Sequence, residues 1–364
     1  RWVSTRPTGT EMATRRGFLA TFAAALAVPR LTWADAGSPA FLAAAKQGQG
    51  FVLCGIGMDG QIVFTLPLPA RGHAAAAHPI RPEAVAFARR PGTFALVIDC
   101  AQGGIAHRLT PPEGRQFNGH GAFSADGARL YTSEVVAETS EGRLGVWDAA
   151  AGYRRVGEWP TNGLGPHELR RMADGTLVIA NGGIQTDPGD RRKLNIETMQ
   201  PNLCYLSPEG VELDRVTLHP DLHQLSTRHL ALGPDGRVAC AMQWEGDPSE
   251  PVPLLALFRR GEPVQMCPAP DAEAWAMKGY AGSIAWNGGQ IALTSPPGGV
   301  VQVFDGAGTF VQTIRRSDAS GVAPLGDGLM VTDGTGAISR IGPAGLEPMQ
   351  RHELAWDNHL VALG

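Results

Sequence analysis

Five histidines of this 364-residue chain occupy the same position in a repeating pattern, so they could do metal or proton chemistry together. They are His73 in Arg-Gly-His, His120 in Asn-Gly-His-Gly, His167 in Gly-Pro-His-Glu, His229 in Thr-Arg-His-Leu and His359 in Asp-Asn-His-Leu. Neutral imidazole is a ligand for Zn, Cu, Fe and Ni, and it can also move protons. Two further segments share the pattern without the histidine, at Ser283 and Gly321.

The spacing of the pattern predicts a β-propeller. Its segments begin at 73, 120, 167, 229, 283, 321 and 359, so successive starts lie 47, 47, 62, 54, 38 and 38 residues apart. Repeats of about 40 residues with strand-like content are typical of propeller blades. In such a fold the histidines would share one rim of one central channel.

Each repeat has the residue pattern of four short strands. In the second repeat these are residues 121–124, 129–132, 144–147 and 153–159. Asp-Gly stands at the first turn of this repeat, at 126–127, and again at 174–175, 235–236 and 327–328. The dipeptide favours tight hairpins because it accommodates positive φ.

The two ends of the chain together complete one blade. Residues 359–364 supply only a first strand, whereas 41–46, 51–56 and 61–66 supply a second, third and fourth strand. Joining them closes the ring and removes exposed sheet edges. We therefore expect an all-β, seven-bladed β-propeller over residues 37–364.

Counting across each first hairpin predicts which residues lie beside the histidines. Fourteen residues separate His120 from Glu134, His167 from Asn181 and His229 from Gln243. The corresponding residues of the other blades are Thr294 or Ser295, Asp333, and Arg89 or Arg90. These side chains are expected to form an inner or adjacent ring on the face that carries the histidines.

The two longest loops, residues 182–201 and 245–253, are expected on that same face. Long loops on one face of a scaffold often carry function. The first loop contains Arg191, Arg192, Lys193 and Asn195, a candidate lid that contacts an anion. Within the repeated motifs, the further pocket candidates are Glu168, Arg228, Ser283 and Asn358.

Three interpretations of the histidines stay open at this point. They could orient the entry into each first strand by hydrogen bonding to the backbone. They could converge as ligands of a metal or metal complex, with Fe, Cu or Zn as candidates. They could also act in acid–base catalysis, His120 with Glu134 or His167 with Glu168. No Gly-x-Ser-x-Gly nucleophile motif is present, and this weakens the last interpretation.

The N-terminus predicts export. Thr14-Arg15-Arg16-Gly17-Phe18-Leu19 opens an apolar stretch to residue 28, and Ala34-Asp35-Ala36 follows as a small-x-small cleavage pattern. This resembles a bacterial twin-arginine signal, so we assign residues 1–36 to an N-terminal extension and signal peptide and expect a periplasmic protein. Translation is expected to start at Met12. No other apolar stretch is long enough to span a bilayer, so no membrane insertion is expected after signal removal.

Charge and cysteine content narrow the partners and cofactors. The net charge is −4 and no long basic run occurs, so nucleic acid is not expected as a partner. The five cysteines form no Cys-x-x-Cys pair and are expected to be mostly small buried apolar residues. No Cys-x-x-Cys-His motif for covalent c-type haem is present.

Several segments together resemble one family of exported proteins, domain-of-unknown-function (DUF) family 1513. They are Phe-Asn-Gly-His-Gly-Ala-Phe-Ser-Ala-Asp-Gly at 117–127, Gly-Leu-Gly-Pro-His-Glu at 163–168, Ala-Asn-Gly-Gly-Ile at 180–184, Lys-Leu-Asn-Ile-Glu-Thr-Met-Gln-Pro at 193–201, Leu-Ser-Thr-Arg-His-Leu at 225–230, Gly-Tyr-Ala-Gly-Ser at 279–283, Thr-Ser-Pro at 294–296 and Trp-Asp-Asn-His-Leu at 356–360. The resemblance covers residues from about 40 to the C-terminus. Where the family commonly has Thr-Glu-Asn-Asp, this chain has Ser133-Glu134-Val135-Val136. It therefore retains the glutamate but has valines in place of the asparagine and the aspartate.

The resemblance implies a periplasmic propeller related to YVTN and WD40-like folds, without an established activity. It also implies an iron-acquisition setting, with imelysin-like proteins and a di-haem oxidoreductase as candidate partners. From all these features we expect a binding protein rather than an enzyme, with a metal, metal complex or small anionic ligand in a His-rich pocket on one channel face. A metal-dependent hydrolase or lactonase and a pure interaction scaffold are the alternatives.

Overall fold

The structure, a computed structural model, describes residues 31–88, 92–190 and 192–363. All the described strands belong to one compact unit, Thr32–Gly364. The twin-arginine segment and Met12 lie outside the described residues, and so do Arg89, Arg90 and Arg191.

This unit consists of seven four-stranded antiparallel sheets, the blades of a β-propeller. Blade 1 contains β4 (Gly72–Ala77), β5 (Glu83–Ala88), β6 (Ala95–Asp99) and β7 (Gly104–Leu109). Blade 2 contains β8 (Arg115–Phe123), β9 (Arg129–Val136), β10 (Glu141–Asp148) and β11 (Arg154–Leu164). Blade 3 contains β12 (Pro166–Arg171), β13 (Leu177–Asn181), β14 (Asn202–Leu206) and β15 (Glu212–Thr217). Blade 4 contains β16 (Leu225–Leu232), β17 (Val238–Trp244), β18 (Leu255–Phe258) and β19 (Gln265–Met266).

The remaining blades follow the same order. Blade 5 contains β20 (Ser283–Asn287), β21 (Gln290–Ser295), β22 (Val300–Asp305) and β23 (Phe310–Arg315). Blade 6 contains β24 (Ala319–Leu325), β25 (Gly328–Asp333), β26 (Ala337–Gly342) and β27 (Gly345–Arg351). Blade 7 contains β28 (Ala355–Ala362), β1 (Phe41–Gln47), β2 (Gly50–Ile56) and β3 (Ile62–Leu68). Short helices η1 (Ile196–Thr198), η2 (Pro220–Leu222) and α2 (Asp271–Ala276) lie in connections.

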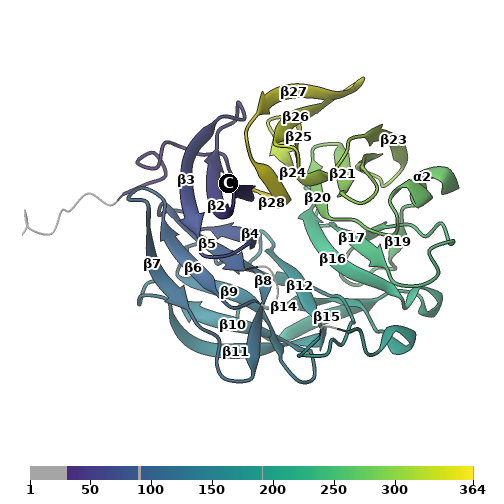
Figure 1. The fold of residues 1–364 in the computed structure, drawn as a ribbon. Helices are drawn as coiled ribbons and strands as arrows, with labels where there is room; N and C mark the ends of the chain where they lie inside the picture. The colour runs from purple at the N-terminus through teal and green to yellow at the C-terminus, as the bar shows by residue number, and fades with distance from the viewer. Residues whose placement is uncertain (1–30, 89–91, 191, 364) are drawn as a thin grey trace, which may run out of the picture. The chain divides into compact units, whose positions relative to one another are not determined.

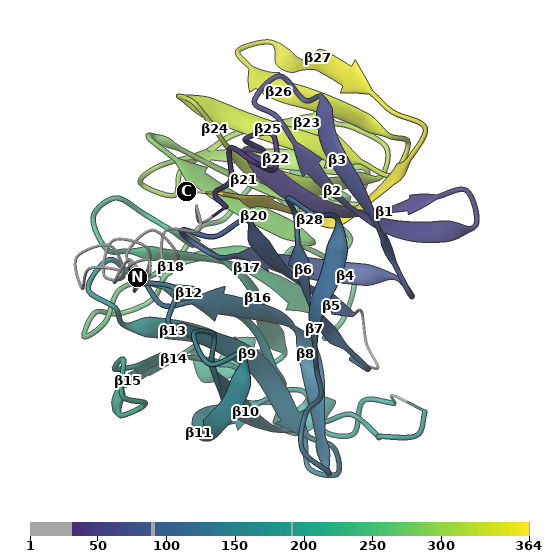
Figure 2. The same cartoon turned by 90° about the vertical axis from the view of Figure 1, so that its left-hand side faces the viewer.

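Blade 7 confirms the predicted closure of the ring. The last strand, β28, pairs antiparallel with β1, so that Phe41 faces Ala362 and Lys46 faces Ala355. Figure 2 shows the purple strands β1–β3 beside the C-terminal strand β28. The first strands of the blades contact one another in sequence around the ring, and in Figure 1 they lie nearest its middle.

The core consists of apolar layers between neighbouring blades. Inner strands are buried on both faces and have nearly continuous apolar sequences, for example Leu-Val-Ile-Ala in β13, whereas outer strands such as β15 are mostly exposed. Each fully buried Leu or Phe in these layers contributes about 1.5–3 kcal/mol. The core therefore holds the first strands in fixed positions around the axis.

The burial of the cysteines agrees with the expectation from the sequence. All five cysteines are buried free thiols within the apolar layers. Among the described residues, no helix has the length and apolar character needed to cross a membrane.

Candidate functional site

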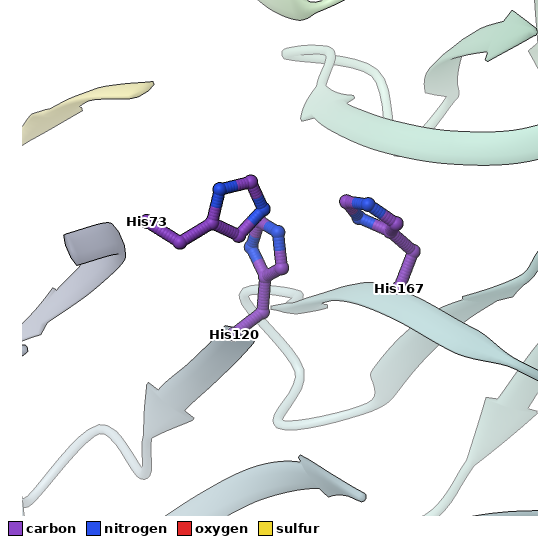
Figure 3. A group of neighbouring side chains, drawn as sticks. All are labelled: His73, His120 and His167. Atoms are coloured by element: carbon purple, nitrogen blue, oxygen red, sulfur yellow. The ribbon is translucent and has the colours of Figure 1, made fainter. Parts of the chain in front are cut away.

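A bulge at the start of the first strand positions most of the histidines. In six blades the pairing register of this strand shifts where the repeated motif lies; in blade 2, for example, the shift falls between Phe117 and Gly121. Blade 5 has no shift, and Ser283 pairs with Thr294 there, as the counting predicted. A bulge leaves a residue without a cross-strand partner and redirects its side chain. Figure 3 shows the rings of His73, His120 and His167 gathered in this way from three blades.

The five histidines, named here the five-histidine cluster, are packed against one another. Neighbouring ring centroids are 4.4–4.9 Å apart around the cluster, and the wider separations are 5.8 Å. The Nε2 atoms of His73 and His359 are 3.3 Å apart. Two overlapping triads each offer three nitrogens within 4.8 Å of one another. Their members are His73, His120 and His167 in one triad, and His120, His229 and His359 in the other.

Two ring nitrogens of the cluster are buried without a hydrogen-bond partner among the residues that the structure describes. His120 is 3% exposed and His167 is 9% exposed. Within the described residues, His120 Nε2 and His167 Nδ1 have no hydrogen-bond partner. Burial, and after it the neighbouring histidines, lowers the pKa of both rings well below its usual value. These two imidazoles are therefore neutral at pH 7, the form that can donate a lone pair to a metal.

The carboxylate of Glu168 lies next to His229 of the cluster. Its Oε2 lies 3.4 Å from His229 Nδ1 and accepts a hydrogen bond from the backbone N–H of Leu230 at 3.0 Å. Its Oε1 pairs with Arg170 at 2.7 Å. Burial raises the pKa of Glu168, but Arg170 and His229 outweigh burial and hold it at about 2. An ionised carboxylate at Nδ1 orients an imidazole so that Nε2 faces a metal, an arrangement common behind metal-bound histidines.

The residues predicted opposite the histidines are displaced by the bulges. Glu134, Asn181, Gln243 and Asp333 pair with Phe117, Pro166, Ser226 and Ala319, respectively, and not with the histidine positions. They lie on the second strand of each blade, whose side chains pack against the neighbouring blades. The expected inner ring of these four side chains is therefore wrong in register.

Each of these four side chains hydrogen-bonds within the blade architecture. Glu134 Oε1 accepts from Arg155 and Thr132, both at 2.7 Å. Asn181 Nδ2 donates to the carbonyl of Thr161 at 2.7 Å and to Asn202 Oδ1 at 2.9 Å.

The other two side chains behave similarly. Gln243 Nε2 donates to the carbonyl of Ala281 at 3.3 Å. Asp333 accepts from the backbone N–H of Thr335 at 2.8 Å and of Ala337 at 3.1 Å, and it pairs with Arg316.

The long loops do contribute charged residues beside the cluster. Lys193 forms an ion pair with Glu245, and Glu245 Oε1 lies 3.7 Å from Nη2 of the buried Arg228. Asn195, in contrast, holds its own loop in shape, because it accepts from Gln185 N at 2.7 Å. It also donates to the carbonyl of Gly183 at 2.8 Å. Arg192 pairs loosely with Asp187 at 3.8 Å and is 70% exposed.

Two of the remaining candidates have structural partners. Ser283 Oγ accepts from Val322 N at 3.3 Å, and Asn358 Nδ2 donates to the Tyr280 hydroxyl at 3.3 Å. Sequence reasoning missed the individual roles of Glu245, Tyr280 and Arg170. Glu245 opens the second long loop directly after β17, and this position is the only signal that could have found it.

A cavity of about 590 Å³ adjoins the cluster inside the propeller. Residues from the first strand of every blade line it, including His120, Glu168, Ser283 and His359 at one end and Ser124, Arg171 and Trp286 at the other. Small apolar side chains such as Ala75 and Ala122 form part of its wall. The cavity gives a small solute a path to two of the histidines.

The positions of the carboxylates and imidazoles bear on the acid–base and metal-binding interpretations of the five histidines. Glu134 pairs with Arg155, and Glu168 lies beside His229 and not beside His167. Neither of the two predicted acid–base pairs therefore forms. Both groups of potential metal ligands found among the described residues consist of histidine alone. A hydrolase site built from these carboxylates and histidines together is therefore not what the arrangement provides. His120 and His167, whose buried nitrogens lack a hydrogen-bond partner in the described part of the chain, can instead coordinate a cation.

Comparison with known proteins gives a family and a distant structural likeness. A family model described as "Protein of unknown function (DUF1513)" matches residues 66–363. The search of curated proteins found no match. Among solved structures, the chain is similar to a protein of unknown function from Bacteroides caccae, with 13% identity and a TM-score of 0.48, over 76% of this chain and 94% of that chain. The family match covers most of the chain, so the protein belongs to the family of unknown function DUF1513.

Proposed function

We propose that the protein binds a transition-metal ion through the five-histidine cluster. One observation carries the proposal: five imidazoles from five blades converge, and buried nitrogens of His120 and His167 have no partner in the described part of the chain. An imidazole nitrogen buried without a hydrogen bond costs about 1–3 kcal/mol. A metal ion would satisfy these nitrogens, whereas an architectural role would give them backbone partners.

The distances in the cluster suit coordination by one small ion. Metal–nitrogen bonds of about 2.0–2.1 Å in a tetrahedral site place two ligand nitrogens about 3.4 Å apart. His73 Nε2 and His359 Nε2 are already 3.3 Å apart. The nitrogens within each triad, at up to 4.8 Å, need to move by about 1 Å. Rotation of the rings about their side-chain bonds can supply that movement.

The ligand type indicates the class of metal. Imidazole suits Zn, Cu, Fe and Ni, whereas Ca and Mg require oxygen ligands that neither triad contains. Fe, Cu and Zn are therefore the ions to test. The cavity that reaches His120 and His359 supplies a path of entry for the ion.

The cellular setting is part of the same proposal. Twin-arginine export to the periplasm and a role in iron handling, beside imelysin-like proteins and a di-haem oxidoreductase, are suggested by the N-terminal motif and the family resemblance. Fractionation of cells that express the full chain tests the first suggestion, and replacement of Arg15 and Arg16 by lysine should retain the protein in the cytoplasm. Capture on immobilised candidate partners tests the second.

Metal analysis of purified protein without a histidine tag tests the proposal directly. The protein is reconstituted in turn with Fe²⁺, Cu²⁺ and Zn²⁺, and the bound metal is counted by mass spectrometry. We expect near-stoichiometric metal in the wild type and its loss in the triple variant His120→Ala/His167→Ala/His229→Ala. The control is His107→Ala, which removes an exposed histidine of the outer strand β7 and should bind as the wild type does. Absence of bound metal with all three ions would overturn the proposal.

A further inference from the structure

Arg228 carries a buried guanidinium and directly precedes His229 of the five-histidine cluster. Arg228 is 7% exposed and is the extra residue of the bulge that directly precedes His229. Its Nε has no hydrogen-bond partner among the described residues. The carboxylate paired with it, Glu245, lies 3.7 Å from Nη2, beyond hydrogen-bond distance. At least one of the five N–H donors of this guanidinium is therefore held out of water without an acceptor in the described part of the chain.

Glu245 is already engaged by a second cation. Its other oxygen, Oε2, forms an ion pair with the ammonium group of Lys193 on the long loop of blade 3. The Glu168 carboxylate faces His229 and Arg170. Burial lowers the pKa of Arg228 from its usual value, which reflects the free-energy cost of keeping this cation in place. Buried charges of this kind are normally compensated by a partner.

A bound metal makes the imbalance larger. The ligands of the five-histidine cluster are imidazoles, which bring no negative charge to offset a cation. Arg228 directly precedes His229 in the chain, within the bulge of this strand. A metal cation and a guanidinium in this space repel each other, and an anion between them is attracted by both.

We propose that the cluster binds its metal together with a small planar oxyanion, bicarbonate or a carboxylate, which Arg228 holds against the metal. This inference rests on the metal-binding function proposed above. The fork of N–H donors in arginine matches the two oxygens of such a group. The Tyr280 hydroxyl accepts a hydrogen bond at 3.3 Å from Asn358, the residue directly before His359 of the cluster.

The planar oxyanion has two candidate sources, which an experiment distinguishes. Dissolved carbonate could supply the oxyanion, or an organic acid that carries the metal could supply a carboxylate. The inference therefore fixes the class of the group and the residue that holds it, and the choice of added anion identifies its source.

The test is Zn²⁺ affinity of the full protein, measured by competition with a chelating dye in carbonate-free chloride buffer at constant pH and ionic strength. The same titration is repeated with added bicarbonate and, separately, with added acetate. The variants are Arg228→Gln and Arg228→Lys, the second of which keeps the charge but loses the fork. The control is Arg215→Gln, which removes an exposed arginine paired with Glu212 on the outer strand β15. Thermal melting verifies that each variant is folded.

We expect the added oxyanion to tighten Zn²⁺ binding by about tenfold or more in the wild type and in Arg215→Gln. Arg228→Gln should lose this dependence, and Arg228→Lys should keep only part of it. A response to bicarbonate alone identifies carbonate, whereas a response to acetate identifies a carboxylate. Equal Zn²⁺ affinity with and without both anions in the wild type would overturn the inference and leave the metal proposal intact. If no metal binds under any condition, the metal proposal itself fails.

Discussion

Replacing His120 with alanine distinguishes a metal ligand from an architectural histidine, because the two roles predict different changes in stability. His120 belongs to both triads, and its Nε2 is buried without a partner in the described structure. In the metal-free protein, alanine removes a buried ring but also removes the cost of that nitrogen, about 1–3 kcal/mol. The carbonyl of His120, which accepts from Ser133 Oγ at 3.1 Å, remains in the variant. The opposing effects should leave the metal-free free energy of unfolding within about 2 kcal/mol of the wild type.

The effect of metal is larger and has a definite size. At a free-metal concentration 100 times Kd, binding to the native state adds about 2.7 kcal/mol. Unfolding entropy of about 2.1 cal/mol/K per residue gives about 0.7 kcal/mol/K for a unit of this length, so the wild-type Tm should rise by about 4 °C. The Tm of His120→Ala should not respond to metal, and that of His107→Ala should rise as in the wild type.

Differential scanning calorimetry with and without metal measures both quantities in one series. The result that would refute the reasoning is a large loss of stability in metal-free His120→Ala together with no response of the wild type to Fe²⁺, Cu²⁺ or Zn²⁺. His120 would then stabilise the blade directly, as the backbone-orienting interpretation of the sequence held.

Three further predictions follow from individual contacts. Gly119 has a φ of 94°, and a Cβ there would lie 2.6 Å from Cδ2 of His73. Gly119→Ala should therefore lower the free energy of unfolding by about 1–3 kcal/mol and reduce metal occupancy. Unchanged melting and metal content would contradict this prediction. Glu168→Gln should weaken metal binding by about 10- to 100-fold in a calorimetric titration, because it removes the charge behind His229; an unchanged affinity would show that the carboxylate does not support the site. Burial raises the pKa of Asp333, but its hydrogen bonds and Arg316 outweigh burial and lower that pKa below its usual value of 3.8. The ionised carboxylate therefore stabilises the fold above pH 3.8, and this contribution is lost as the pH falls through the lowered pKa. Asp333→Asn should therefore show a smaller loss of stability below pH 3.8 in acid-unfolding curves, and a curve parallel to the wild type would exclude this role.

The sequence predicted the blades because their determinants are local. Asp-Gly turns mark the first hairpin of four blades, apolar strands recur in all of them, and the unmatched strands at 41–66 and 359–364 can complete only one blade. The convergence of the histidines followed from the repeat itself, since equivalent positions of a propeller lie around one axis. Glu168 lies beside His229 of the cluster, and Arg228 lies 3.7 Å from Glu245, which also pairs with Lys193 of the long loop.

The residue-level pairing could not be predicted, because a bulge changes the register without an obvious mark in the sequence. Two extra residues lie in β8 between the pairs Phe117–Glu134 and Gly121–Thr132, so a count of fourteen from His120 gives the wrong partner. The bulge also contacts the neighbouring blade, because the side chain of Asn118 donates a hydrogen bond to the carbonyl of Pro166 in blade 3. Only the tertiary structure contains that information.

The absence of histidine from blades 5 and 6 is itself explained by packing. In blade 6, a Cβ on Gly321 would lie 2.8 Å from the backbone nitrogen of Leu360, so β28 approaches too closely for any side chain there. In blade 5, Ser283 stands in a strand without a bulge and supports Val322. Blade 6 thus has no room for an imidazole, and blade 5 lacks the bulge that directs most of the histidines inward. The five imidazoles come from consecutive blades, 7 to 4, and their rings close on one another, because the centroids of His229 and His359 are 4.7 Å apart. Ser283 and Val322 of the two remaining blades form part of the cavity wall instead.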